Sequence, residues 1–138
     1  MILWNDSLIK REDAVVDIED RGYQFGDGVY EVVRFYDRKW FEMDAHLERL
    51  EQSAQKIGID LPYSLEQLKE YINALLAESD VRTGNVYIQV TRGVAPRNHP
   101  FPEVVSPTIV AYLIPYDRPL ENMQQGVKAT LMEDVRWL

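Results

Sequence analysis

The chain has 138 residues, of which 46% are apolar and 28% charged, with a formal net charge of −8 and no cysteine. This composition is typical of a globular domain with its own core and argues against intrinsic disorder. It excludes disulfides and cysteine-zinc sites, and the sequence shows neither an apolar run of membrane-spanning length nor a basic stripe that would bind nucleic acid.

The amino-terminal third is predicted to be strands and turns. Residues 2–4 and 8–10, separated by Asn5 and Asp6, are typical of a short hairpin. The stretch "DRGYQFGDGVYEVV" (20–33) follows with three glycines, and its Gly-Asp-Gly predicts a turn. The spacing does not match a dinucleotide fingerprint, and no helix is expected after the glycines.

Residues 29–36 alternate like a strand, which places Glu31 on the more apolar face and Tyr30 on the other. Glu31 is either exposed at the strand end or held on a buried face, where it would need a positive or hydrogen-bonding partner. Tyr30, beside Val32, is either a core aromatic or the lining of a pocket whose ligand meets its hydroxyl.

Two consecutive helices are predicted next, after a possible strand at residues 40–43. Asp44 is the expected N-cap of a first helix that ends near Ile57, with Gly58 as its terminator. Residues 64–67, "SLEQ", form a capping box that opens the second helix. Its apolar stripe has helical spacing: Leu65, Leu68, Ile72, Leu75 and Leu76.

Two strands at 86–90 and 108–114 complete an α+β pattern of helices packed on an antiparallel or mixed sheet. The loop between them is long and stiffened by four prolines, a length that is often functional. A further strand at 127–132 has no obvious partner upstream, so we expect the sequence to be a piece of a longer protein.

Arg97 and His99 lie two residues apart on the stiffened loop and would point the same way in an extended backbone. A guanidinium and an imidazole together suit a carboxylate, although a solvated loop tip fits the same residues. Arg92, at the strand end, carries less weight in this interpretation.

His46, Arg49 and Ser53 share one face of the first helix, where they would either meet an anion or remain a solvated surface. With two histidines and no cysteine, the sequence has no metal-site spacing, and we expect no metal.

The segments "DRGYQFGDGVYEVV" and "RGVAPRNHPFPE" resemble the class IV pyridoxal-phosphate aminotransferases, and the Arg-x-His pair resembles their D-amino acid branch. The resemblance extends from "LWND" to "EDVRWL". It implies a cytoplasmic homodimer that transfers the amino group between D-alanine and 2-oxoglutarate, giving pyruvate and D-glutamate. D-amino acids and 2-oxo acids would be its small-molecule partners, with no nucleic acid and no membrane.

The resemblance also implies roles for five residues. Tyr30 would contact the substrate carboxylate and Val32 would line the same pocket, while Arg97 and His99 would complete the carboxylate site from the neighbouring subunit. Arg49 would bind the cofactor phosphate.

The family's small amino-terminal domain, a two-layer α/β sandwich, would be residues 1–115. Residues 116–125 would be a linker, and residues 126–138 would begin a larger cofactor domain. The Schiff-base lysine is expected beyond the carboxyl end, because none of the chain's five lysines has the family's context, so the 138 residues alone are predicted to be inactive.

Three alternatives stay open. A branched-chain aminotransferase or an aminodeoxychorismate lyase would share the fold but change the reaction, and the Arg97-x-His99 pair argues against both. A non-catalytic ligand-binding domain would be of another class altogether.

Overall fold

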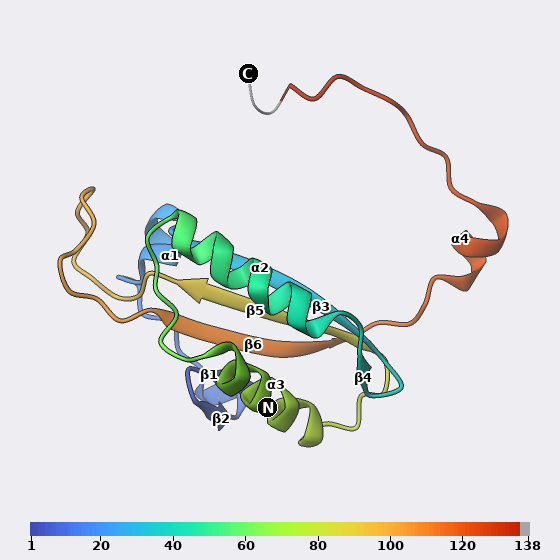
Figure 1. Ribbon diagram of the computed structural model, residues 1–138, viewed down its shortest axis with the longest axis horizontal. Helices are drawn as coiled ribbons and strands as arrows, with labels where there is room; N and C mark the ends of the chain where they lie inside the picture. The colour runs from blue at the N-terminus through green and yellow to red at the C-terminus, as the bar shows by residue number, and fades with distance from the viewer. Residues whose placement is uncertain (136–138) are drawn as a thin grey trace.

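The computed structural model describes residues 1–135 and has one six-stranded antiparallel sheet with its helices gathered mainly on one face (Figure 1). The strands lie in the order β2-β1-β6-β5-β3-β4. Their bounds are β1 Ile2–Trp4, β2 Ser7–Ile9, β3 Gly28–Tyr36, β4 Lys39–Trp40, β5 Gly84–Thr91 and β6 Thr108–Pro115. The expected α+β class is confirmed, and the sheet is antiparallel at every pairing of these strands.

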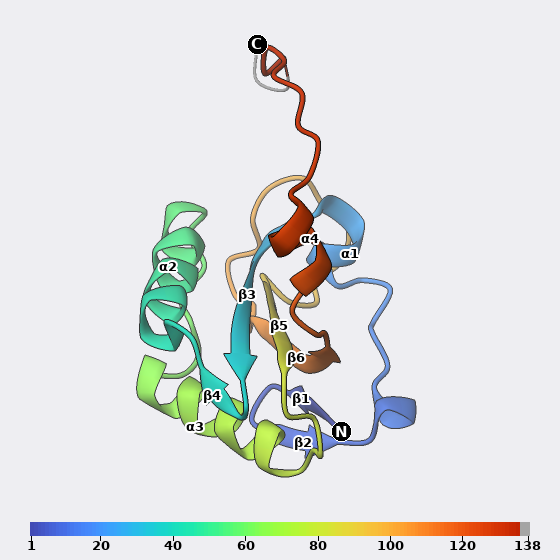
Figure 2. The same ribbon diagram turned by 90° about the vertical axis from the view of Figure 1, so that its right-hand side faces the viewer.

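The two long helices, α2 (Met43–Lys56) and α3 (Leu65–Ala77), both pack on one side of the strands, as Figure 2 shows. The predicted capping box of α3 is present, because the Ser64 side chain accepts from the Gln67 amide and the Gln67 side chain accepts from the Ser64 amide. Gly58 follows the end of α2 as expected, and the amides of Gly58 and Ile59 close that end by donating to carbonyls of the last turn.

The core lies between these helices and the covered face of the sheet. The strand alternation predicted for 29–36 is confirmed, since Glu31, Val33 and Phe35 are buried while Tyr30 and Val32 are exposed. Large, fully buried side chains come from both layers, among them Leu3, Phe35, Leu47, Leu50, Leu68, Ile72, Leu75, Ile88 and Ile109. An antiparallel sheet commonly has one face on the core and one open, and this sheet follows that rule.

The cap expected at Asp44 is wrong by two residues. Glu42 is the N-cap of α2, with a left-handed backbone (φ 55°), and Asp44 lies in the first turn, where its carboxylate pairs with Lys69. The strand expected at 40–43 is accordingly short, because the chain turns into the helix at Met43.

The glycine-rich stretch contains a helix that the sequence reasoning did not expect, α1 (Arg21–Phe25), after a single 3-10 turn, η1 (Arg11–Asp13). Asp20 caps α1 by accepting from the Gly22 amide, and Gly26 ends it with a positive φ of 64°. A five-residue helix gives little periodic signal, and the Gly-Asp-Gly that follows it favoured a turn.

After Pro115 the chain leaves the sheet, passes through the short helix α4 (Leu120–Gln125) and extends away from the body (Figure 1). The strand predicted at 127–132 is not present: residues 127–135 are exposed and have no assigned secondary structure. A strand needs a neighbour for its backbone groups, and none lies beside this segment within residues 1–135. The remaining residues of the chain, 136–138, which were expected to continue the larger domain, lie outside the described part.

Candidate functional site

The open face of the sheet places Tyr30 and Val32 where a ligand could reach them. Tyr30 is 64% exposed, and its ring stacks on that of Tyr87 with centroids 5.9 Å apart. Tyr87 in turn contacts Tyr112 on β6 and donates its hydroxyl to Gln89. Burial, with Tyr112 and Tyr30 close by, raises the pKa of Tyr87, so this hydroxyl stays a donor at neutral pH.

A pocket of about 540 Å³ opens on this face and includes Tyr30 in its lining. The sheet forms its floor, and the glycine-rich segment around α1 forms its rim. The residues that line the whole pocket are Trp4, Val16, Asp20, Gly22, Tyr23, Gly26, Gly28, Tyr30, Tyr87, Gln89, Thr91, Thr108 and Val110. The volume is that of a small-molecule site, and the lining is aromatic with a few polar groups. The open interpretation of Tyr30 as a pocket residue is therefore the one that the fold supports.

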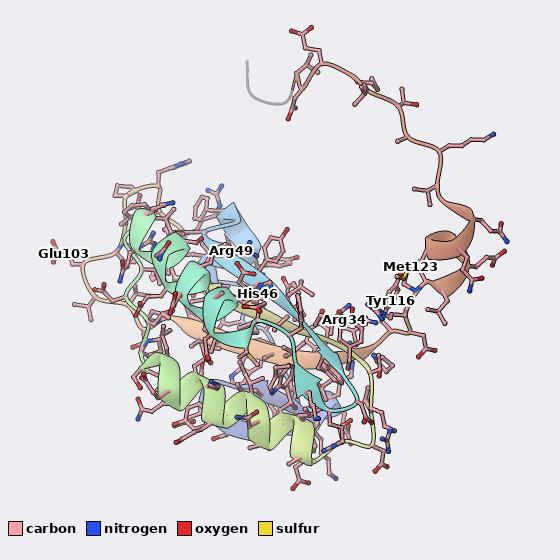
Figure 3. All side chains as sticks on the ribbon, turned by 45° about the vertical axis from the view of Figure 1, so that its right-hand side comes forward. Arg34, His46, Arg49, Glu103, Tyr116 and Met123 are labelled. Carbon is pink, nitrogen blue, oxygen red and sulfur yellow. The ribbon has the colours of Figure 1, made fainter. Side chains whose placement is uncertain are left out.

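Glu31, on the covered face, is a buried carboxylate with two partners from α2. Arg49 binds it with both ends of its guanidinium, Nε to Oε1 and Nη2 to Oε2 (2.7 Å), and His46 Nδ1 donates to Oε2 at 2.8 Å. The stick view in Figure 3 shows His46 and Arg49 extending from the same helix. The hydrogen bonds from Arg49, supported by His46 and opposed by burial, hold the pKa of Glu31 below its ordinary value.

This arrangement decides between the two alternatives for Glu31. Glu31 is the partnered, buried acid rather than an exposed strand end. Arg49 keeps 64% of its side chain exposed, and its hydrogen bonds to Glu31 use Nε and Nη2, while its expected contact with an anion stays a prediction.

Arg97 and His99 are both exposed on the loop between β5 and β6, and both lie against Phe25 at the end of α1. The Arg97 guanidinium is 5.1 Å from the centroid of that ring, and the His99 ring centroid is 5.8 Å from it. The structure therefore brings these two side chains to one aromatic ring, and their binding of a carboxylate stays a prediction.

The structure does not join this pair to Tyr30 within one chain. Among residues 1–135, no hydrogen bond, ion pair or ring contact connects Tyr30 with Arg97 or His99. The two halves of the expected carboxylate site thus make no contact with each other in this part of the chain, and their assembly from two copies stays a prediction.

Sequence reasoning missed a buried ion cluster made of Arg21, Asp27 and Arg92. Their side chains are 3%, 9% and 6% exposed. Asp27 accepts from Arg21 Nε at 2.8 Å and from Arg92 Nε and Nη2 at 2.8 and 3.0 Å. Burial acts to raise the pKa of Asp27, but the hydrogen bonds from Arg92 and Arg21 outweigh it and hold the pKa below the ordinary 3.8.

The sequence around Arg92 and around Asp27 contained a signal from which this cluster could have been predicted. Arg92 follows a strand of alternating buried residues and so sits at a position where a charge would be surrounded by protein. A charge there requires a partner. Asp27 was assigned only a turn role, so the pairing was not anticipated.

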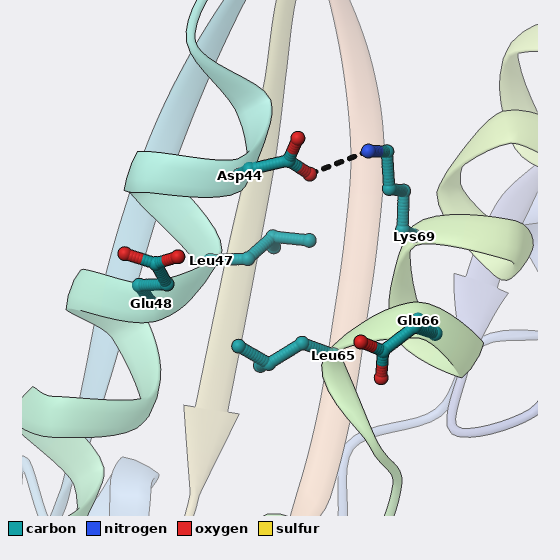
Figure 4. Close-up of a pocket in the computed structure, with 6 residues that line it drawn as sticks. All are labelled: Asp44, Leu47, Glu48, Leu65, Glu66 and Lys69. Carbon is teal, nitrogen blue, oxygen red and sulfur yellow. Dashed lines mark hydrogen bonds and ion pairs between the residues drawn. The ribbon is translucent and has the colours of Figure 1, made fainter.

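A second hollow, of about 290 Å³, lies between α2 and α3 and is shown in Figure 4. Three carboxylates and one lysine line it together with two leucines: Asp44, Leu47, Glu48, Leu65, Glu66 and Lys69. The lysine that lines it is already paired with Asp44, so this lining is unsuited to an anionic ligand. The ion pair links the two helices across the hollow.

Neither a metal-binding cluster nor a membrane-crossing helix is found within residues 1–135. No three histidine, aspartate or glutamate side chains in that range gather as a metal ion would need. No helix there has both the length and the apolar character to cross a bilayer.

A family model described as amino-transferase class IV matches residues 28–138. The D-alanine aminotransferase of Staphylococcus epidermidis is 52% identical over 135 residues, which is 97% of this chain and 48% of the relative. The D-alanine aminotransferase of Listeria monocytogenes is 51% identical over 140 residues, or 99% of this chain and 48% of the relative. The chain thus spans about half the length of these curated relatives.

Solved structures share the fold at lower identity. The branched-chain amino acid aminotransferase of Escherichia coli matches with a TM-score of 0.79 and 22% identity, over 83% of this chain and 40% of that one. The 4-amino-4-deoxychorismate lyase of Pseudomonas aeruginosa matches with a TM-score of 0.75 and 25% identity, over 92% and 44%. The residues that the family model matches include most of the sheet and both long helices, and the chain belongs to the class IV aminotransferase family.

Proposed function

We propose that this chain is the amino-terminal part of a pyridoxal-phosphate-dependent D-amino acid aminotransferase. The reaction would take the amino group from D-alanine to 2-oxoglutarate and yield pyruvate and D-glutamate. The observation that carries the proposal is the identity of about half the residues with D-alanine aminotransferases over nearly the whole chain. Its structural support is an exposed guanidinium and imidazole on one loop, suited to a carboxylate.

The donor set fits one part of the cofactor, its phosphate. Arg49 is exposed, is fixed in direction by Glu31 and keeps one nitrogen for another acceptor. A solved branched-chain amino acid aminotransferase with the same fold, at a TM-score of 0.73, is described as complexed with N-(5'-phosphopyridoxyl)-L-glutamate. When bound, the cofactor would supply an electron sink for bond changes at the α-carbon.

The residues of this chain would bind and orient the amino acid. Tyr30 would donate its hydroxyl to the substrate carboxylate, and Val32 would limit the pocket beside it. Arg97 and His99 would add charged donors to the same carboxylate from a second copy. Fixing the carboxylate at three points would set which face of the α-carbon meets the catalytic base.

The proposal includes a homodimer in the cytoplasm, with residues 1–115 as a small domain, 116–125 as its linker and 126–138 as the start of a larger one. It is supported by the lack of any hydrogen bond, ion pair or ring contact between Tyr30 and Arg97 or His99 within residues 1–135 of one chain, since a second copy could bring them to one ligand. The exposed tail after Pro115 is consistent with a connection to further chain. The Schiff-base lysine would belong to that further chain.

The test is a donor panel on the full-length protein that carries this sequence, loaded with pyridoxal phosphate. We expect D-alanine to be the preferred donor with 2-oxoglutarate as acceptor. Preference for L-valine or L-leucine would overturn the proposal in favour of a branched-chain enzyme.

The Arg97→Ala variant tests the carboxylate site directly. We expect the KM for D-alanine to rise about tenfold or more, since a charged carboxylate loses its fork. Arg82→Ala is the matched control, because Arg82 is an exposed arginine whose ion pair is with the equally exposed Asp37. An unchanged KM in Arg97→Ala would argue against the site.

A further inference from the structure

The loop that carries Arg97 and His99 is hydrogen-bonded to the buried ion cluster of Arg21, Asp27 and Arg92. Arg21 Nη1 donates to the carbonyl of Asn98 at 2.7 Å and reaches that of Pro100 at 3.5 Å. Asn98 and Pro100 flank His99, and Asn98 directly follows Arg97 in the chain. The backbone that sets the direction of both side chains is therefore bound to a guanidinium that is 3% exposed.

The direction of Arg21 is in turn set by Asp27. The carboxylate accepts from Arg21 and at the same time binds Arg92 with both oxygens. Arg92 continues to the carbonyls of Ile57 and Gly58 at the end of α2, at 2.7 and 2.9 Å. A continuous set of charge-assisted bonds thus runs from the end of α2 to the tip of the loop.

Aromatic rings and the backbone complete the support. Phe25 lies under the Arg21 guanidinium (4.6 Å) as well as under Arg97, and Phe101 lies 3.8 Å from the Arg92 guanidinium. At the base of the loop, the Arg21 amide donates to the carbonyl of Gly93. Figures 1 and 2 show the loop and α1 at the same end of the sheet.

We propose that Arg21, oriented by Asp27, is a positioning residue that holds Arg97 and His99 in the geometry in which they bind the substrate carboxylate. This inference rests on the proposed function for the ligand, and on the structure for the holding contacts. The physical reason is that a long proline-rich loop has few backbone bonds of its own, and a buried guanidinium supplies fixed donors to its carbonyls.

The chosen variant is Arg21→Met, which keeps an unbranched apolar stem and removes the guanidinium with its donors. It should fold, because Asp27 retains its two-oxygen pairing with Arg92 and the cluster becomes a one-to-one ion pair. Arg21→Lys is the conservative companion: it keeps the charge near Asp27 but lacks the fork needed for Asp27 and Asn98 together.

The control is Arg38→Met. Arg38 likewise donates to backbone carbonyls, those of Leu76 and Ser79, but at the opposite end of β3 from the loop. A general effect of losing a guanidinium that binds backbone carbonyls would affect both variants, whereas a positioning role at the loop would affect Arg21 alone.

In the full-length protein with its cofactor, Arg21→Met should raise the KM for D-alanine about tenfold with kcat changed much less, and Arg38→Met should leave both near wild type. Arg21→Lys should recover only part of the loss. In a background of Arg97→Ala and His99→Ala, adding Arg21→Met should change KM little, because its effect passes through those side chains. An unchanged KM in Arg21→Met, or a full additional rise in that background, would overturn the proposal.

Amide hydrogen exchange of residues 94–101 gives a readout that needs no reaction. We expect faster exchange there in Arg21→Met than in wild type or Arg38→Met, and equal exchange would overturn the holding role. A wild type without D-amino acid transfer would refute the proposed function instead, and the exchange measurement would then still decide whether Arg21 holds the loop.

Discussion

Replacing Asp27 with asparagine should destabilise the fold strongly. Among residues 1–135, this carboxylate is the acidic partner that Arg21 and Arg92 share, and all three side chains are at least nine-tenths buried. Asparagine keeps one acceptor oxygen, but its amide group would face guanidinium donors, so the charge and at least one of the three hydrogen bonds are lost. Removing one partner of a buried ion pair costs about 3–5 kcal/mol of unfolding free energy.

The assay is urea unfolding followed by far-UV circular dichroism, with Asp37→Asn as the matched control. Asp37 also binds an arginine, Arg82, but both side chains are more than two-thirds exposed, so we expect little change there. Equal shifts in the two variants, or a cost for Asp27→Asn below about 1 kcal/mol, would refute the reasoning about the buried cluster.

The pH dependence of the same stability follows from the lowered pKa of Asp27. A folded-state pKa below the ordinary 3.8 means that the carboxylate stabilises the fold above that pH. The contribution disappears as pH falls through the folded value, where the proton competes with both arginines. Wild type should therefore lose stability below about pH 4 more steeply than Asp27→Asn does, and parallel profiles would contradict this assignment.

Three further variants test other parts of the structure. Leu68→Ala removes a fully buried side chain from α3 and should lower the free energy of unfolding, measured in urea, by about 2–5 kcal/mol. A smaller loss would mean that neighbouring side chains move in to fill the cavity. Gly93→Ala should destabilise the fold and free the loop, since φ is +103° and an added Cβ would lie 1.9 Å from the Ser106 carbonyl oxygen; wild-type protease resistance would argue otherwise. Glu31→Gln should lower the urea midpoint less than Asp27→Asn does, because Arg49 is 64% exposed and can return to water, and the reverse ranking would contradict that.

Local patterns in the sequence were reliable where neighbours within a few residues decide the structure. The alternation at 29–36 predicted the covered and open faces of β3, and the "SLEQ" capping box predicted the start of α3. The same reasoning failed at Asp44, because α2 begins after a left-handed residue, Glu42, that no propensity favours. It failed again at α1, which is capped by Asp20 and tied to the strand residue Thr91 far along the chain.

The candidate site likewise has features that followed from local sequence and features that depended on tertiary packing. The pairing of Arg97 with His99 and the need of Glu31 for a partner followed from residue type and spacing alone. Which cation meets Glu31 was decided by the packing of α2 against β3, which brings Arg49 and His46 to it. Two residues eighteen apart in sequence cannot be paired from periodicity, because their separation depends on where the helix lies on the sheet.

By itself the sequence determined the strand faces and the two long helices, since backbone geometry imposes periods of two and 3.6 on any buried face. Only the tertiary structure decided how Arg21, Asp27 and Arg92 meet beneath the loop. Asp27 and Arg92 are 65 positions apart, and the β3–β5 register and the end of α2 place them together. Burying two guanidiniums is favourable only when that whole arrangement supplies the carboxylate and carbonyls around them.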